Sequence, residues 1–93
     1  MIIVTVIGSD DELQTAEDLA ATAAACQNIL LGAESRGLAS FWASSSAMRH
    51  PRTLNWCGAD DSERFVGALW LGGRNCDPST PTRAPLAEVS QWL

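Results

Sequence analysis

The chain has 93 residues, 46% of them hydrophobic and four of them tryptophan. A chain of this length forms one small domain, which buries only roughly 60% of the surface that its unfolded form exposes. So much apolar surface on so small a volume favours an obligate partner or an oligomer over a free monomer.

The charge pattern argues against nucleic acid as a ligand. The formal net charge is −5, with eleven acidic residues against six basic ones, all arginine. The acidic excess lies in the first half, and the part after Ala47 holds five acids and five arginines. Affinity for phosphate backbones comes from clustered cations, so we expect no nucleic-acid partner. Five arginines are enough to bind one small anion.

The first strand is predicted at Ile2 to Ile7, a continuous run of mostly β-branched residues that ends at Gly8. Such a run is typical of a strand buried on both faces, and an interior strand at the start of a chain indicates a fold begun partway through. The segment Asp10-Asp11-Glu12 that follows is most simply a solvated loop, because it lacks the ligand spacing of a calcium loop.

An alanine-rich run from Ala16 to Arg36 predicts one long helix, of roughly 30 Å at 1.5 Å per residue. We expect Thr15 to cap its first turn together with Asp18, and Gly37 to end it in the left-handed conformation. Its apolar stripe is too broad for a helix with one wet face, so a second helix or a second subunit is expected to cover it.

A membrane span is not expected for this helix, because Gln27 and Asn28 lie at its centre and charged residues lie within it. A reduced, cytoplasmic setting fits best. Met1 leads directly into the first strand without the features of a signal peptide. The three cysteines form no C-x-x-C pair, so neither a disulfide framework nor a zinc site is predicted.

The rest of the chain predicts two strands, one short helix and a tail. The strands are expected at 38–43 and 64–71, the second ended by Gly72-Gly73, and the helix at 52–57 after Pro51. Residues 74–93 contain the remaining prolines and predict an extended C-terminal arm with a short hydrophobic anchor. The fold class is therefore α+β, a single domain over 1–93 with a core at 1–73 and an arm at 74–93.

Several kinds of catalytic site are not supported by the spacing. Gly8-Ser9-Asp10 is no dinucleotide fingerprint. Ser44 to Ser46, His50 and Asp60 have the residue types of a hydrolase triad, but a nucleophile elbow is absent and the order is wrong. His50 is more simply a surface or helix-capping residue. A thiolate pair of Cys57 with His50 has no other support.

A longer pattern resembles a known family. The segment AAACQNILLGAESRGLASFWASS, then FVGALWLGG after a polar turn, then TRAPLAEV, is similar to the C-terminal half of the flavin-dependent nitroreductase family. The resemblance covers about Ala16 to Val89 and implies a partial nitroreductase-like fold with three core strands, one long central helix, a short helix and an extended arm. Since the family's N-terminal half has no counterpart here, a truncated or split form, or a second polypeptide that completes the fold, is expected.

The resemblance also implies the cofactors and the site residues. Family members are homodimers that pair through the long helix and bind FMN at the interface. The backbone of Trp42, Ala43, Ser44 and Ser45 would contact the isoalloxazine ring, and Arg83 would bind the phosphate. Core packing remains the alternative for Trp42, and a solvated arm residue the alternative for Arg83.

Weaker candidates are Arg74 for the same phosphate and residues 32–37 for the nicotinamide. The implied function is hydride transfer from NAD(P)H to FMN and then to a nitroaromatic or quinone-like acceptor, with no catalytic side chain required. The alternative is a flavin-free dimerising or interaction domain that has lost the active site.

Overall fold

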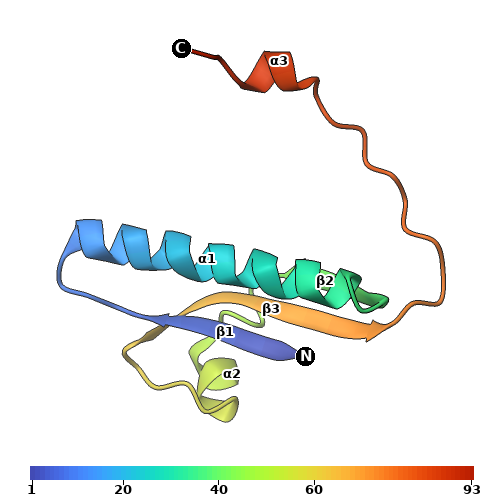
Figure 1. Cartoon of the computed structure of the whole chain (residues 1–93). Helices are drawn as coiled ribbons and strands as arrows, with labels where there is room; N and C mark the ends of the chain where they lie inside the picture. Colours follow the sequence, from blue (N-terminus) through green and yellow to red (C-terminus); the bar gives the residue numbers. More distant parts are fainter.

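The computed structural model describes all 93 residues and contains every element that the sequence predicts (Figure 1). The elements in chain order are β1 (Ile2–Ile7), α1 (Glu12–Glu34), β2 (Leu38–Ala43), α2 (Pro51–Trp56), β3 (Glu63–Gly73) and α3 (Leu86–Val89). The α+β class is therefore confirmed. No helix in the structure combines the length and apolar character that crossing a bilayer requires.

The three strands form one antiparallel sheet in the order β1-β3-β2. The central strand is β3, which Figure 1 shows between the other two, with α1 on one side of the sheet and α2 on the other. The prediction that β1 is an interior strand buried on both faces is wrong for this sheet. It lies at an edge and is half-buried, because only β3 pairs with it.

The boundaries of β3 also differ from the prediction. Gly72 and Gly73 were expected to end the strand, but they pair with Ala39 and Leu38 of β2 and so belong to the sheet. Near its start β3 has an irregularity opposite β1, where Val4 pairs with Gly67 and Thr5 with Phe65. One residue of β3 is left over between these pairs. Such a bulge changes the alternation of side chains between the two faces.

Helix α1 begins four residues earlier than predicted. Asp11 is its N-cap, and its carboxylate accepts hydrogen bonds from the backbone N–H groups of Leu13 (2.9 Å) and Gln14 (3.4 Å). The prediction of Thr15 as the cap, with Asp11 and Glu12 in a solvated loop, is wrong. Thr15 lies inside the first turns, where its hydroxyl donates to the Ser9 carbonyl oxygen at 3.1 Å. An aspartate satisfies the orphan N–H groups of a helix start better than a threonine.

At its other end α1 stops at Glu34, two residues before the predicted end at Arg36, but the predicted left-handed Gly37 is confirmed. Ser35 is the C-cap, and Gly37 has a φ of +72°, the left-handed conformation that suits glycine just after a helix. The N–H groups of Arg36 and Gly37 bond to the carbonyls of Ala33 and Glu34, which satisfies two carbonyls of the last turn. The chain then reverses directly into β2.

Only one side of α1 is covered within this chain. Cys26 and Ala33 are buried against the sheet, seven residues apart on one side of the helix. The opposite side carries Leu13 and Leu31, which are 68% and 58% exposed. The sequence predicts that other elements cover α1 on several sides. Within this chain, only the side that faces the sheet is covered.

The core lies between α1 and the sheet. It is built on three buried residues, Cys26, Val66 and Leu69. Half-buried residues from the helix and from all three strands pack around them, namely Val4, Val6, Leu30, Trp42 and Leu71. Burial raises the pKa of the Cys26 thiol, since the thiolate form would lose its hydration there.

Helix α2 is capped as the sequence predicts. His50 is the N-cap, and its Nδ1 accepts a hydrogen bond from the N–H of Arg52 at 3.2 Å. Pro51 occupies the first turn, and Gly58 follows the helix with a φ of +89°. Leu54 is the residue of α2 that is buried.

The C-terminal arm, residues 74–93, leaves the end of β3 and extends away from the rest of the chain (Figure 1). Its one helical turn, α3, contains no buried residue, and Trp92 is 89% exposed. The radius of gyration is 16.2 Å, against about 12 Å for a compact domain of this length. The predicted anchor, Val89, Trp92 and Leu93, is thus largely exposed in this chain.

Candidate functional site

The end of β2 places Trp42 on the helix side of the sheet. Trp42 pairs with Leu69 of β3, and its indole covers Gly67 so closely that a Cβ atom on that glycine would lie 2.0 Å from Nε1. Trp42 therefore packs against the core, which is the alternative that the sequence left open. Ala43, the last residue of the strand, pairs with Ala68 and is half-buried.

The two serines after β2 differ in what they bond to. Ser45 starts a turn: its hydroxyl accepts from the N–H of Met48 at 3.3 Å and its carbonyl from the N–H of Arg49 at 3.1 Å. Ser44 is exposed and makes no hydrogen bond through its backbone or its side chain. Its N–H and C=O groups are thus free to bond to a ligand.

Arg83 lies on the exposed arm and makes no ion pair or hydrogen bond. The arm starts beside Leu38, because Gly73 pairs with that residue, whereas Ser44 lies beyond the other end of β2. Six strand residues span about 20 Å. The arm then leads away from the sheet, so one copy of the chain does not bring Arg83 and Ser44 together (Figure 1). Arg74 is engaged elsewhere, in an ion pair with Glu34.

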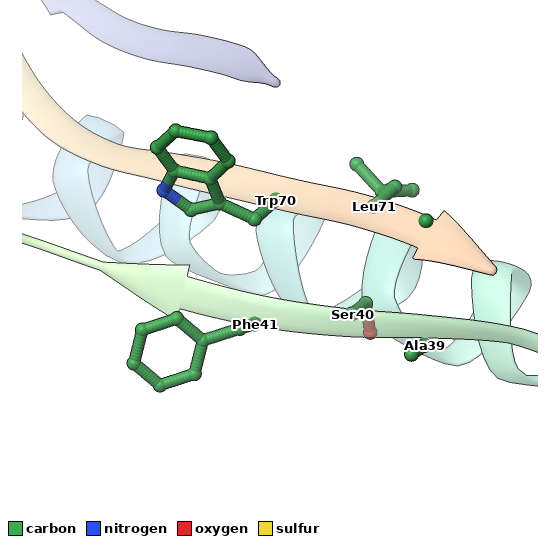
Figure 2. A pocket seen from close by; sticks show the side chains of 6 residues that line it. Ala39, Ser40, Phe41, Trp70 and Leu71 are labelled. Carbon is green, nitrogen blue, oxygen red and sulfur yellow. The ribbon is translucent and has the colours of Figure 1, made fainter. Parts of the chain in front are cut away.

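The sheet face opposite α1 carries an apolar groove that the sequence did not indicate. Phe41 and Trp70 are direct neighbours on β2 and β3, 66% and 46% exposed. Figure 2 shows their rings along the two strands, with α1 behind the sheet. Ala39 and Gly72 extend the groove, which is shallow and has a volume of about 280 Å³. We call this surface the open face.

The remaining titratable residues do not assemble a catalytic group. His50 is used in capping α2, and the Asp60 carboxylate accepts from the N–H and the hydroxyl of Ser62 at 2.7 and 2.6 Å. These bonds stabilise the carboxylate and lower the pKa of Asp60. Cys57 and Cys76 are exposed free thiols. The structure contains no cluster of three metal-binding side chains.

Comparison with known proteins shows which family has this arrangement of strands and helices. The model of the nitroreductase family matches residues 1–73, which is the sheet with α1 and α2. The chain belongs to the nitroreductase family. The structural comparison agrees: the crystal structure of a nitroreductase-like family protein from Bacillus cereus is 31% identical, with a TM-score of 0.87.

The extent of this match differs between the two proteins. It covers 98% of the present chain and 49% of the Bacillus cereus chain, so the chain described here spans about half the length of that relative. No significant match was found among curated protein sequences. The match includes most of the arm, and it confirms the nitroreductase-like fold that the sequence predicted.

Two features of this member of the nitroreductase family could not be predicted from the sequence. The contact of Trp42 with Gly67 depends on strand register, which hydrophobic patterns do not specify between strands far apart in sequence. The pairing of Phe41 with Trp70 on the open face has the same origin. Each of the two strands has an aromatic residue within an apolar run, and this feature of the sequence could have indicated that the aromatic residues pair.

Proposed function

We propose that this chain forms part of an FMN-dependent oxidoreductase of the nitroreductase type, working in the cytoplasm as a homodimer or with a second chain that completes the fold. The observation that carries the proposal is Ser44, whose backbone N–H and C=O are free and exposed at the end of β2. A flavin ring presents both acceptors and donors along one edge. A backbone position with both groups unpaired suits such an edge.

The residues around Ser44 would hold the ring in place rather than react. Trp42 is fixed by its contact with Gly67, and Ala43 is tied to β3 by the strand pairing. The strand end therefore has little freedom before Ser44, and the turn that Ser45 begins restrains the chain after it. A rigid frame of this kind reduces the conformational entropy lost when a cofactor binds.

Arg83 would bind the phosphate of FMN. Its guanidinium is unpaired, and planar guanidinium groups bond to phosphate oxygens in a bidentate manner. Because Arg83 and Ser44 lie apart within one chain, the arm of one copy would act on a site formed with another. The exposed outer side of α1, with Leu13, Ala20, Ala24 and Leu31, supplies a surface through which two copies would pair.

When bound, FMN would supply the redox chemistry, by accepting hydride from NAD(P)H and passing electrons to a nitroaromatic or quinone-like acceptor. The chain's own residues would bind the ring and neutralise the phosphate. None of them has to act as acid or base. The specific acceptor would be a small molecule.

Titration with FMN tests this assignment. Arg83→Ala should weaken FMN binding by about 1.5–3 kcal/mol, the usual contribution of a hydrogen bond to a charged group. Arg52→Ala, at an exposed position of α2, is the matched control and should leave the affinity unchanged. Ser44→Pro removes the backbone N–H and should also weaken binding, whereas Ser44→Ala retains it and should not. Equal affinity in all four variants would remove both residues from the site.

The alternative function is a flavin-free dimerising or interaction domain. The separation of Arg83 from Ser44 within one chain favours it, since the chain alone does not assemble both parts of a flavin site. A colourless protein that dimerises and gains no thermal stability from added FMN would support this alternative, because a ligand that binds the native state raises its stability.

A further inference from the structure

A second cavity lies at the other edge of the sheet, away from β2. It has a volume of about 230 Å³ and is more enclosed than the open face. Its walls come from β1, α1, β3 and the loop before α2. The lining residues are Val6, Thr15, Leu19, Arg49, Arg64, Phe65 and Val66. We call it the edge pocket.

The edge pocket has two free positive charges. The ion pair between Arg74 and Glu34 is the one salt bridge in the structure, so neither Arg49 nor Arg64 is neutralised by a carboxylate. Neither guanidinium donates a hydrogen bond within the chain. Both guanidinium groups are therefore available to an anion that enters the cavity.

A packing contact holds Arg49 near the pocket, and Arg64 is exposed at its rim. The guanidinium carbon of Arg49 lies 5.6 Å from the centre of the Phe65 ring, a cation–π arrangement that leaves the N–H groups at its edge free. The aliphatic stem of Arg64 passes beside Gly8, where an added Cβ would lie 3.8 Å from Cδ. Holding the Arg49 guanidinium in advance reduces the entropy lost when a ligand binds.

The other walls are apolar. Val6, Leu19, Phe65 and Val66 supply them, and the hydroxyl of Thr15 is already bonded to the backbone of Ser9. A bare inorganic anion would leave these walls without contacts. A neutral hydrocarbon would leave the arginines unpaired. The lining therefore matches a ligand with one anionic end and a small apolar body.

We propose that the edge pocket binds a small monocarboxylate with an aromatic or branched apolar body. Its carboxylate is bound by Arg49 and Arg64, and its apolar part lies against Val6, Leu19 and Phe65. The volume is below the usual range for drug-sized ligands, which limits the ligand to a single ring or a short branched chain. The lining includes neither Ser44 nor Arg83, although the turn from Ser45 to Arg49 connects this pocket to the end of β2.

Calorimetric titration of the full chain with benzoate tests this proposal. Arg49→Gln and Arg64→Gln should each weaken benzoate binding about ten- to a hundredfold, as expected for loss of a hydrogen bond to a charged group. Arg52→Gln removes the same charge outside the pocket and should leave binding unchanged. Benzyl alcohol and inorganic phosphate should both bind at least tenfold more weakly than benzoate.

Chemical-shift mapping of the unsubstituted chain adds a readout that does not depend on the folding of a variant. Benzoate should shift the amide signals of Val6, Thr15 and Phe65, and adding FMN should not reverse these shifts. Absence of benzoate binding would overturn the proposal. So would phosphate binding as tight as benzoate, an equal loss in Arg52→Gln, or shifts confined to residues outside the pocket.

Discussion

At the scale of single residues, the contact between Trp42 and Gly67 decides how β2 meets β3. Any side chain at position 67 would occupy the place of the indole, since even a Cβ atom would lie 2.0 Å from Nε1. Glycine is required here for space and not for a special backbone angle. The same contact aligns the strand end that leads to Ser44.

We expect Gly67→Ala to destabilise the protein by about 1–3 kcal/mol, the usual cost of overpacking a core. The free energy of unfolding from urea titration measures it. Gly72→Ala is the control, because an added Cβ there meets no atom within 4 Å, and its effect should stay within about 0.5 kcal/mol. Equal effects of the two substitutions would show that the indole moves aside at no cost.

The three thiols should differ in reactivity with a thiol reagent. Cys57 and Cys76 are exposed, so both should react within the mixing time, whereas Cys26 is fully buried and should react only as the protein unfolds. The raised pKa of Cys26 adds a pH dependence. Above the ordinary value of 9.0 the unfolded state loses this proton and the native state retains it, so stability should fall as pH rises from there. Fast labelling of all three thiols at neutral pH would contradict the buried position.

At the scale of elements, α1 has one side against the sheet and an exposed outer side. Small and apolar residues recur on that outer side at Leu13, Ala20, Ala24 and Leu31. Alanines allow close approach of another helix, and a helix with both sides apolar is normally buried on both. Pairing of two copies through this side would bury it.

Ala24→Glu should therefore weaken self-association at least tenfold, because it places a charge in the proposed contact. Sedimentation equilibrium measures the dissociation constant. Ala47→Glu adds the same charge in the exposed turn after β2 and should leave association unchanged. A dimer that withstands the change at position 24 must form through another surface.

The elements also show how far the sequence determined the fold. Apolar runs with a glycine at one end predict all three strands and both main helices, because these patterns depend only on residues close together in the sequence. The start of α1 was misplaced because Asp11 and Thr15 are both acceptable caps, and only the path of the chain after β1 selects between them. The central position of β3, the edge position of β1 and the edge pocket depend on pairing between distant segments, which no local signal encodes.

At the scale of the whole molecule, the arm is the part of the chain whose residues are all exposed. Apart from the pair between Arg74 and Glu34, its side chains make no hydrogen bond or ion pair with the core. Its last residues include an exposed Val89 and an exposed Trp92. An apolar end carried on an extended segment is suited to bind another protein surface.

Removal of residues 76–93 should leave the core folded and weaken self-association. Circular dichroism should retain the signal of α1 and the sheet, because the shortened chain keeps Arg74 and all the pairs of β3. Sedimentation equilibrium should give a higher dissociation constant than that of the full chain. An unchanged constant would exclude the arm from the assembly.

The central place of β3 also governs the order in which this chain can acquire structure during synthesis. Ile2 pairs with Leu69, and neither β1 nor β2 pairs with the other, so no part of the sheet can form before β3 has left the ribosome. Until then the two edge strands have no strand to pair with and α1 has no sheet to pack against, so their apolar sides are exposed. Such long-range pairing slows folding and prolongs the aggregation-prone stage. A chain truncated before residue 63 should consequently bind chaperones more strongly than the released full chain.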